Sequence, residues 1–103
     1  MFKKPDIVYF ADEKLTKQVT KVAFPTDVEP ETTVRETVWA FNMGSAKLSK
    51  IKVTVSPSND DVTIKCAPST LNPMEKGLII LEWTPKKEEK LTVTVNVDGR
   101  YPR

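Results

Sequence analysis

The chain has 103 residues, of which 39% are hydrophobic and 29% are charged, a composition typical of one soluble globular domain. Its 16 basic and 14 acidic residues are well mixed and leave a net charge of +2, so no basic stripe of the kind that binds nucleic acid is visible. Histidine is absent and Cys66 is the single cysteine. This excludes an internal disulfide, a closed zinc site and a Cys/His nucleophile pair, and we expect neither a cofactor nor a metal.

The N-terminal sequence Met1–Asp6 lacks the apolar core of a signal peptide. The longest apolar run is far shorter than the roughly 20 residues that cross a membrane as a helix. Together with the absence of a disulfide, these features predict expression in a reducing cytoplasm without insertion into a membrane. They are compatible with later incorporation into a particle such as a virion.

The order of apolar runs and turn signals predicts about seven strands. Residues 1–18 are expected to form an N-terminal extension or an edge segment, and residues 19–103 the main domain. The expected strands cover residues 7–10, 19–24, 33–41, 48–56, 62–66, 78–84 and 91–97. All eight prolines fall outside these segments, as expected because a proline inside a ladder removes a hydrogen bond.

Residues 78–84, bounded by Gly77 and Pro85, are apolar at both odd and even positions and therefore predict a strand in the interior of a sheet. Residues 48–56 and 91–97 instead alternate apolar and polar side chains, which is typical of half-buried antiparallel strands. The predicted fold class is all-β, an immunoglobulin-like antiparallel β-sandwich without the Cys…Trp…Cys signature of antibody domains.

Three short motifs carry a family resemblance. The stretch from Val34 to Leu48 is similar to the "V…V-x-L-x-N-x-G-S/T-x-x-L" strand and turn of ASPM/SPD-2/Hydin-type (ASH) domains and of major sperm protein. Ser69–Glu75 resembles their "L-x-P-G-E" turn, with Met74 in place of the preferred glycine, and Leu81–Pro85 resembles their "V-x-F-x-P" strand end. Similar motifs occur in small immunoglobulin-like structural proteins of phage virions, and the resemblance covers residues 19–97.

The resemblance implies a non-enzymatic module that binds or scaffolds other proteins. We expect a subunit or decoration of a larger assembly, such as a phage virion or a homo-oligomer. The alternative is a cytoskeletal or membrane-contact scaffold of the ASH or major-sperm-protein type. An enzyme would have to rely on carboxylates, and none of these lies in a recognisable motif.

Trp39, Phe41 and Met43 are the first candidates for a protein interface. If Asn42 takes the position that the family motif gives it, Val38 and Ala40 point inward, and Trp39 and Phe41 form an aromatic patch on the opposite face. The reverse register places both aromatic side chains in the core. The frequent burial of aromatic residues in strands favours that reverse register.

Leu78 and Ile80 are the second candidates, because an inward Leu81 and Trp83 leave them on the other face of their strand. They then need a cover from the N-terminal segment, from another strand or from a partner subunit. We favour the N-terminal segment, and residues 7–10 in particular.

The remaining polar motifs have simpler interpretations. The turn Asn59–Asp61 could offer oxygen ligands to Ca²⁺, but such residues more often form local turn hydrogen bonds. Cys66 is expected to be a small, inward core residue. Lys86–Lys90 is expected to be a solvated hairpin loop. The basic residues near the termini, which include Lys3, Lys4, Arg100 and Arg103, could form a tether to an acidic surface, but free termini are more often charged without a specific role.

Overall fold

The structure is a computed structural model that describes residues 6–102 of the chain. This part contains eight strands and no helix, and every pairing between the strands is antiparallel. The strands are β1 (Ile7–Phe10), β2 (Gln18–Val19), β3 (Val22–Ala23), β4 (Val34–Asn42), β5 (Ser49–Ser56), β6 (Val62–Cys66), β7 (Lys76–Trp83) and β8 (Thr92–Arg100).

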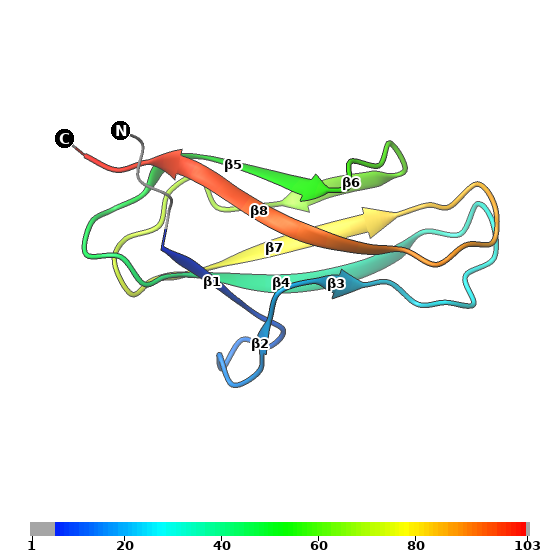
Figure 1. Cartoon of the computed structure of the whole chain (residues 1–103), viewed down its shortest axis with the longest axis horizontal. Helices are drawn as coiled ribbons and strands as arrows, with labels where there is room; N and C mark the ends of the chain where they lie inside the picture. The colour runs from blue at the N-terminus through cyan, green and yellow to red at the C-terminus, as the bar shows by residue number, and fades with distance from the viewer. Residues whose placement is uncertain (1–5, 103) are drawn as a thin grey trace.

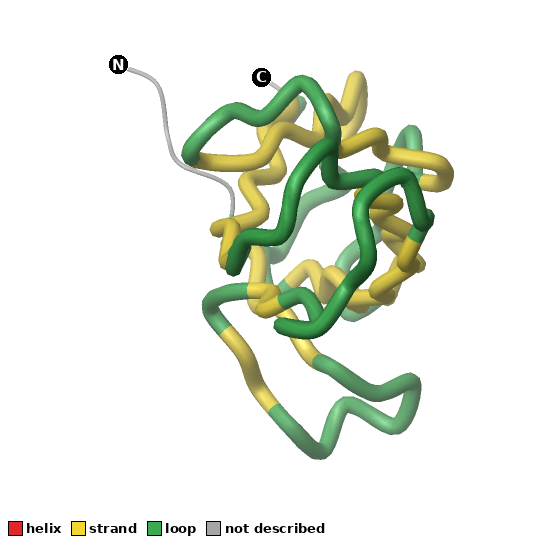
Figure 2. Tube along the Cα trace, turned by 90° about the vertical axis from the view of Figure 1, so that its right-hand side faces the viewer, coloured by secondary structure: helices red, strands yellow, loops and turns green. Residues whose placement is uncertain are grey.

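The strands form two layers. One sheet has five strands in the order β2-β1-β4-β7-β6, and the other has three in the order β3-β8-β5. In Figure 1, β8 crosses in front of β7 and β4, and the end-on view of Figure 2 shows strands on all sides of one central core. The prediction of an all-β antiparallel sandwich is confirmed. The predicted interior strand is β7, which pairs with β4 on one side and with β6 on the other.

The core lies between the layers, where alternate residues of facing strands meet. β7 contributes Ile79, Leu81 and Trp83, each with no exposed surface, and β8 contributes three valines opposite them. Trp83 packs against Phe24, with 5.3 Å between the ring centroids. The fully or largely buried core comprises Val22, Phe24, Val28, Val38, Ala40, Leu48, Leu71, Ile79, Leu81, Trp83, Val93, Val95 and Val97.

Among residues 6–102, Asn42 is the one buried polar residue, and its side chain is fully paired. Its Nδ2 donates to the carbonyl oxygens of Leu71 (2.9 Å) and Ala46 (3.1 Å), and its Oδ1 accepts from the amide of Gly44 (2.9 Å). A buried amide that is bonded in this way avoids the desolvation cost of an unpaired polar group. It joins the turn after β4 to the chain segment before β7.

Two expectations about local structure are wrong. Residues 19–24 do not form one strand. The chain bends at Thr20 and Lys21, so β2 pairs with β1 in the five-stranded sheet and β3 pairs with β8 in the other. Lys86–Lys90 is not a hairpin loop either, because it lies in the connection between β7 and β8, which belong to different sheets.

The described positions with a left-handed backbone are not occupied by glycine. No described glycine has a positive φ, whereas Met74 has a φ of 62°. Gly77 is needed for another reason: a Cβ at this position would lie 2.7 Å from Pro68 and 3.0 Å from Leu71. Its backbone therefore approaches the preceding loop more closely than any residue with a side chain allows.

Candidate functional site

The outer face of the five-stranded sheet carries a group of apolar side chains that is separate from the core. Residues paired across antiparallel strands point to the same face, so the register arranges them in rows. From one end of the sheet to the other, the rows are Val8, Phe41 and Lys76; Phe10, Trp39 and Leu78; Thr37, Ile80 and Cys66; and Arg35, Glu82 and Thr63.

We call the apolar part of these rows the aromatic face. It consists of Val8, Phe10, Trp39, Phe41, Leu78 and Ile80, all of them half-buried. None of the six belongs to the core or to the side chains that pack on it. Their partial burial therefore comes from neighbours on their own side of the sheet. A contiguous apolar surface across three strands is typical of a protein-binding site.

Aromatic contacts order this face. Phe10 and Phe41 meet edge to face, with ring centroids 6.4 Å apart and an interplanar angle of 79°. The Lys76 Nζ lies 5.3 Å from the centroid of the Trp39 ring, within the range of a cation–π contact. The same Nζ donates to the carbonyl oxygen of Glu13 (2.6 Å). These contacts hold the aromatic rings in fixed positions.

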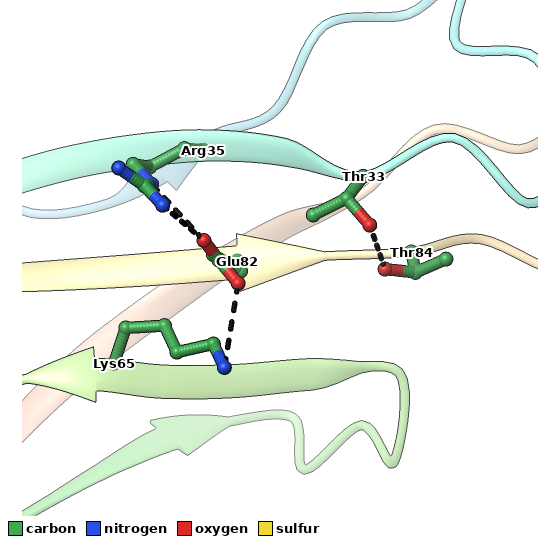
Figure 3. Close-up of polar contacts among 5 residues, drawn as sticks. All are labelled: Thr33, Arg35, Lys65, Glu82 and Thr84. Carbon is green, nitrogen blue, oxygen red and sulfur yellow. Dashed lines mark hydrogen bonds and ion pairs between the residues drawn. The ribbon is translucent and has the colours of Figure 1, made fainter.

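A polar strip borders the aromatic face (Figure 3). Glu82 on β7 accepts two hydrogen bonds from Arg35 on β4, at 3.0 Å from Nε and 2.5 Å from Nη2. Lys65 on β6 lies 3.7 Å from the other carboxylate oxygen, and the hydroxyls of Thr33 and Thr84 are 2.7 Å apart. The face therefore ends where charged and hydroxyl side chains begin.

These contacts change the titration of Glu82. The hydrogen bonds from Arg35 lower the pKa of the Glu82 carboxyl below its ordinary value, while partial burial acts in the opposite direction. The charge of Lys65 adds to the lowering. The carboxylate is thus held in its charged form at the border of an apolar surface.

The register of β4 decides whether Trp39 and Phe41 lie in the core or on the outer face. Val38 and Ala40 are buried, and Trp39 and Phe41 lie on the outer face. The favoured expectation that both aromatic residues belong to the core is therefore wrong. Asn42 fixes this register, because its buried side chain bonds to Leu71 and Ala46 on the inner side. Met43, the third candidate, follows on the turn and is 54% exposed.

Leu78 and Ile80 do point outward, opposite the inward Leu81 and Trp83. The expectation that residues 7–10 cover them is wrong. Those residues form β1, a neighbour of β4 within the same sheet, so β1 widens the outer face instead of covering it. The loop of residues 11–17 projects below the sandwich in Figures 1 and 2, and its Glu13 contacts Lys76 on the outer face.

The expectation that Cys66 is an inward core residue is also wrong. The pairing of β6 with β7 shifts between Ile64 and Cys66, which places Cys66 opposite the outward Ile80. Cys66 is a free, exposed thiol. A β-bulge inserts one residue and so reverses the face on which the following side chain lies. Strict alternation from Val62 and Ile64 could not reveal this shift.

The turn Asn59–Asp61 shows the local bonding typical of such turns. The Asn59 Oδ1 accepts from the amide of Asp61 (2.8 Å), and the Asp61 carboxylate lies 3.7 Å from the Lys86 Nζ.

Of the terminal basic residues, Arg100 ends β8 and is exposed, while Lys3, Lys4 and Arg103 lie outside the described residues. Within residues 6–102, no group of three or more acidic or cysteine side chains is arranged to hold a metal ion. The same part of the chain has no helix that could span a bilayer.

The outer face of the three-stranded sheet is polar in contrast. Its paired outward residues are Lys52 with Asp98, Thr54 with Asn96, and Ser56 with Thr94. All but Thr94 are exposed. The valines that alternate with them face the core. The apolar outer surface is therefore a property of one sheet and not of the fold as a whole.

Comparison of the chain with protein-family models, with curated protein sequences and with solved structures found no match. Sequence reasoning identified Trp39, Phe41, Leu78 and Ile80 as candidates and missed Val8 and Phe10. The alternation of these two with Ile7 and Tyr9 was the available signal, because it divides a four-residue apolar run into an inner and an outer pair.

Proposed function

We propose that this chain is a non-catalytic protein-interaction module that docks onto another protein through the aromatic face. In this proposal it acts as a structural subunit or decoration of a larger assembly. A phage virion is our first choice of setting, and a cytoskeletal or membrane-contact scaffold is the alternative.

The contiguity of the aromatic face carries the proposal. Six apolar side chains on β1, β4 and β7 adjoin one another on a surface that does not serve the core. Aromatic residues in the centre of an interface often supply most of the binding energy, because their rings bury a large area at a small cost in side-chain entropy. Trp39 is central here, since Phe10 and Leu78 flank it in the same row.

The border of the face fits the same role. Protein interfaces commonly have an apolar centre and a polar rim. Here the ion pairs of Glu82 with Arg35 and Lys65 form the rim on one side, and Lys76 with Glu13 forms it on another. The charges of the rim are paired within the chain, so a partner does not have to neutralise them.

The test compares matched variants of the two outer faces. The tagged full chain is purified from cells that encode it, as wild type, as Trp39→Ala and as Thr54→Ala. We expect one defined partner, or the chain's own oligomer, to be retained by the wild type and by Thr54→Ala and to be lost in Trp39→Ala. Because Trp39 lies outside the core, its replacement should leave a cooperative melting transition.

Two results would contradict the proposal. One is a strictly monomeric wild-type chain, by light scattering, that retains no partner under any condition. The other is a partner that Trp39→Ala retains and Thr54→Ala loses, since this would place the interface on the polar sheet.

A further inference from the structure

One edge of β8 is only partly paired. On the side of β5, β8 pairs from Ser56↔Thr94 to Lys52↔Asp98. On its other side, β3 pairs with Thr92 and Val93 alone. Beyond that point no described strand continues the sheet, because the chain before β3 bends away to form β2 in the other layer.

The direction of the main-chain groups along this edge follows from the bonds that do exist. In an antiparallel ladder the N–H and C=O groups of alternate residues point to the same side. The Leu91 carbonyl accepts from the Phe24 amide (3.0 Å), and the Val97 amide donates to the Tyr9 hydroxyl (2.9 Å). Both groups point away from β5, so the main-chain groups of Val93 and Val95 point the same way.

Val95 is therefore the position of this edge whose main-chain groups have no partner. Only 4% of the residue is exposed, so an added strand reaches these groups only through the groove beside them. Val93 on one side of it is paired with Val22, and the Val97 amide on the other side is occupied by a side chain. Among residues 6–102, no hydrogen bond to the main chain of Val95 is found on this side. A main-chain donor and acceptor left open at a sheet edge favour the addition of another strand.

A groove of about 290 Å³ lies along the open position. Its walls are Ile7–Tyr9 of β1, the segment Gln18–Thr20, and Thr94–Asn96 of β8. The groove lies between β1 and β2 of one sheet and β8 of the other, and Ile7, Val19 and Val95 supply apolar side chains to its lining. The surface thus combines main-chain hydrogen-bonding groups with an apolar slot beside them.

We propose that this groove binds an extended segment of a partner polypeptide, which adds to β8 as an antiparallel strand and continues the line of β3. Only an extended peptide presents alternating N–H and C=O groups at the spacing that the edge requires. β3 gives the pattern: Val22 bonds to Val93 and buries its side chain. The partner residue opposite Val95 then points inward too, so it has to be apolar. The proposal is independent of the aromatic face.

Tyr9 has a defined part in this interaction. Its hydroxyl holds the Val97 amide across the groove, and a longer partner strand has to replace that hydroxyl with a main-chain carbonyl. Tyr9→Phe removes the competitor without removing the ring from the wall. The variant is therefore expected to bind an added strand about fivefold more tightly than the wild type, the value of one ordinary hydrogen bond.

The first test uses a blocked peptide of the sequence Lys-Thr-Val-Thr-Val-Thr-Val-Thr-Lys, titrated into the isotopically labelled full chain and followed by NMR. In the proposed geometry the valines point into the groove and their amides face β8. The peptide should shift the amide signals of Val95, Val97 and Gln18–Thr20 and slow the hydrogen exchange of Val95. The same peptide with N-methyl groups on its valines should bind at least about tenfold more weakly, while N-methyl groups on its threonines should have little effect.

The second test changes the protein. Val95→Pro removes the open N–H without breaking a bond to β5, a position at which an edge strand tolerates proline. Val95→Ala is the matched control, since it shortens the side chain and keeps the N–H. Peptide binding should be lost in Val95→Pro and kept in Val95→Ala. Should Val95→Pro fail to fold, the two methylated peptides still decide the question.

Several results would overturn the proposal. Equal binding of the two methylated peptides would show that main-chain pairing is not used. Protection of the Val95 amide in the free monomer would show that the chain's own residues 19–21 close the edge. Self-association that perturbs Val95 without peptide would identify a second copy as the occupant. An unchanged spectrum at saturating peptide would show that the groove accepts no strand.

Discussion

The two outer faces of the sandwich are built from strands of the same alternating kind, yet they present different surfaces. On the three-stranded sheet the outward residues are lysine, threonine, serine, asparagine and aspartate. On the five-stranded sheet they include Trp39, Phe41, Leu78 and Ile80. Both sheets cover the same core, so the needs of folding do not explain the difference.

The comparison shows which apolar residues the fold itself does not require. β5 and β8 demonstrate that a strand of this protein folds with polar residues at every outward position. β4 and β7 have apolar residues at the same kind of position, where contact with water is unfavourable by roughly 25 cal/mol per Å² of apolar area. This difference between the faces supports the proposal that the aromatic face docks onto another protein.

The largest expected effect is the difference in stability loss between replacing the inner tryptophan, Trp83, and the outer tryptophan, Trp39. Trp83 has no exposed surface and packs on Phe24, so Trp83→Ala should destabilise the protein by about 4 kcal/mol. Trp39 is half-buried on the aromatic face, so Trp39→Ala should cost about 1 kcal/mol. Chemical denaturation of the two variants measures both values. Equal losses would show that Trp39 is a core residue and would remove the contrast between the faces.

A smaller effect on the free energy of unfolding is expected when lysine replaces one outward residue on each of the two outer faces. Ile80→Lys places a charge among Leu78 and Trp39 and should cost about 1 kcal/mol, because it exposes apolar neighbours that Ile80 covers. Thr54→Lys, on the polar face, should change the free energy of unfolding by less than about 0.5 kcal/mol. Urea unfolding curves of both variants provide the measurement. A larger loss for Thr54→Lys would reverse the comparison.

The elements with a strict pattern could be predicted from the sequence. The apolar run Leu78–Leu81 of β7 identified an interior strand, and the alternation in β5 and β8 identified strands with one polar face. A side-chain period of two carries this information directly, because successive side chains point to opposite faces.

The predictions that were wrong concern features that depend on long-range contacts. The outward position of Cys66 follows from a bulge against β7, and the switch of the chain between β2 and β3 depends on the edges that β1 and β8 offer. Neither is visible in local composition. Met74 is an intermediate case, since the turn takes the left-handed backbone that glycine favours although the sequence supplies methionine.

The smallest expected effect concerns the pH dependence of the rim. The pKa of Glu82 is lower in the folded protein than its ordinary value of 4.5, chiefly through the hydrogen bonds from Arg35. A lowered folded-state pKa gives stability that is present above the unfolded pKa and is lost as the pH falls through the folded pKa. The stability difference between wild type and Glu82→Gln should therefore be constant near neutral pH and shrink below about pH 4.5.

Arg35→Gln is the matched variant for this measurement, because it removes the donor and keeps the carboxyl. Unfolding curves between neutral and acid pH should show a weaker acid dependence in Arg35→Gln than in the wild type. In about 1 M salt, where the Debye length falls to roughly 3 Å, the difference should decrease further, since the pair lies at the surface. A difference that persists unchanged at acid pH would show that Glu82 stabilises the sheet by packing, and the polar rim would then belong to the fold and not to the binding surface.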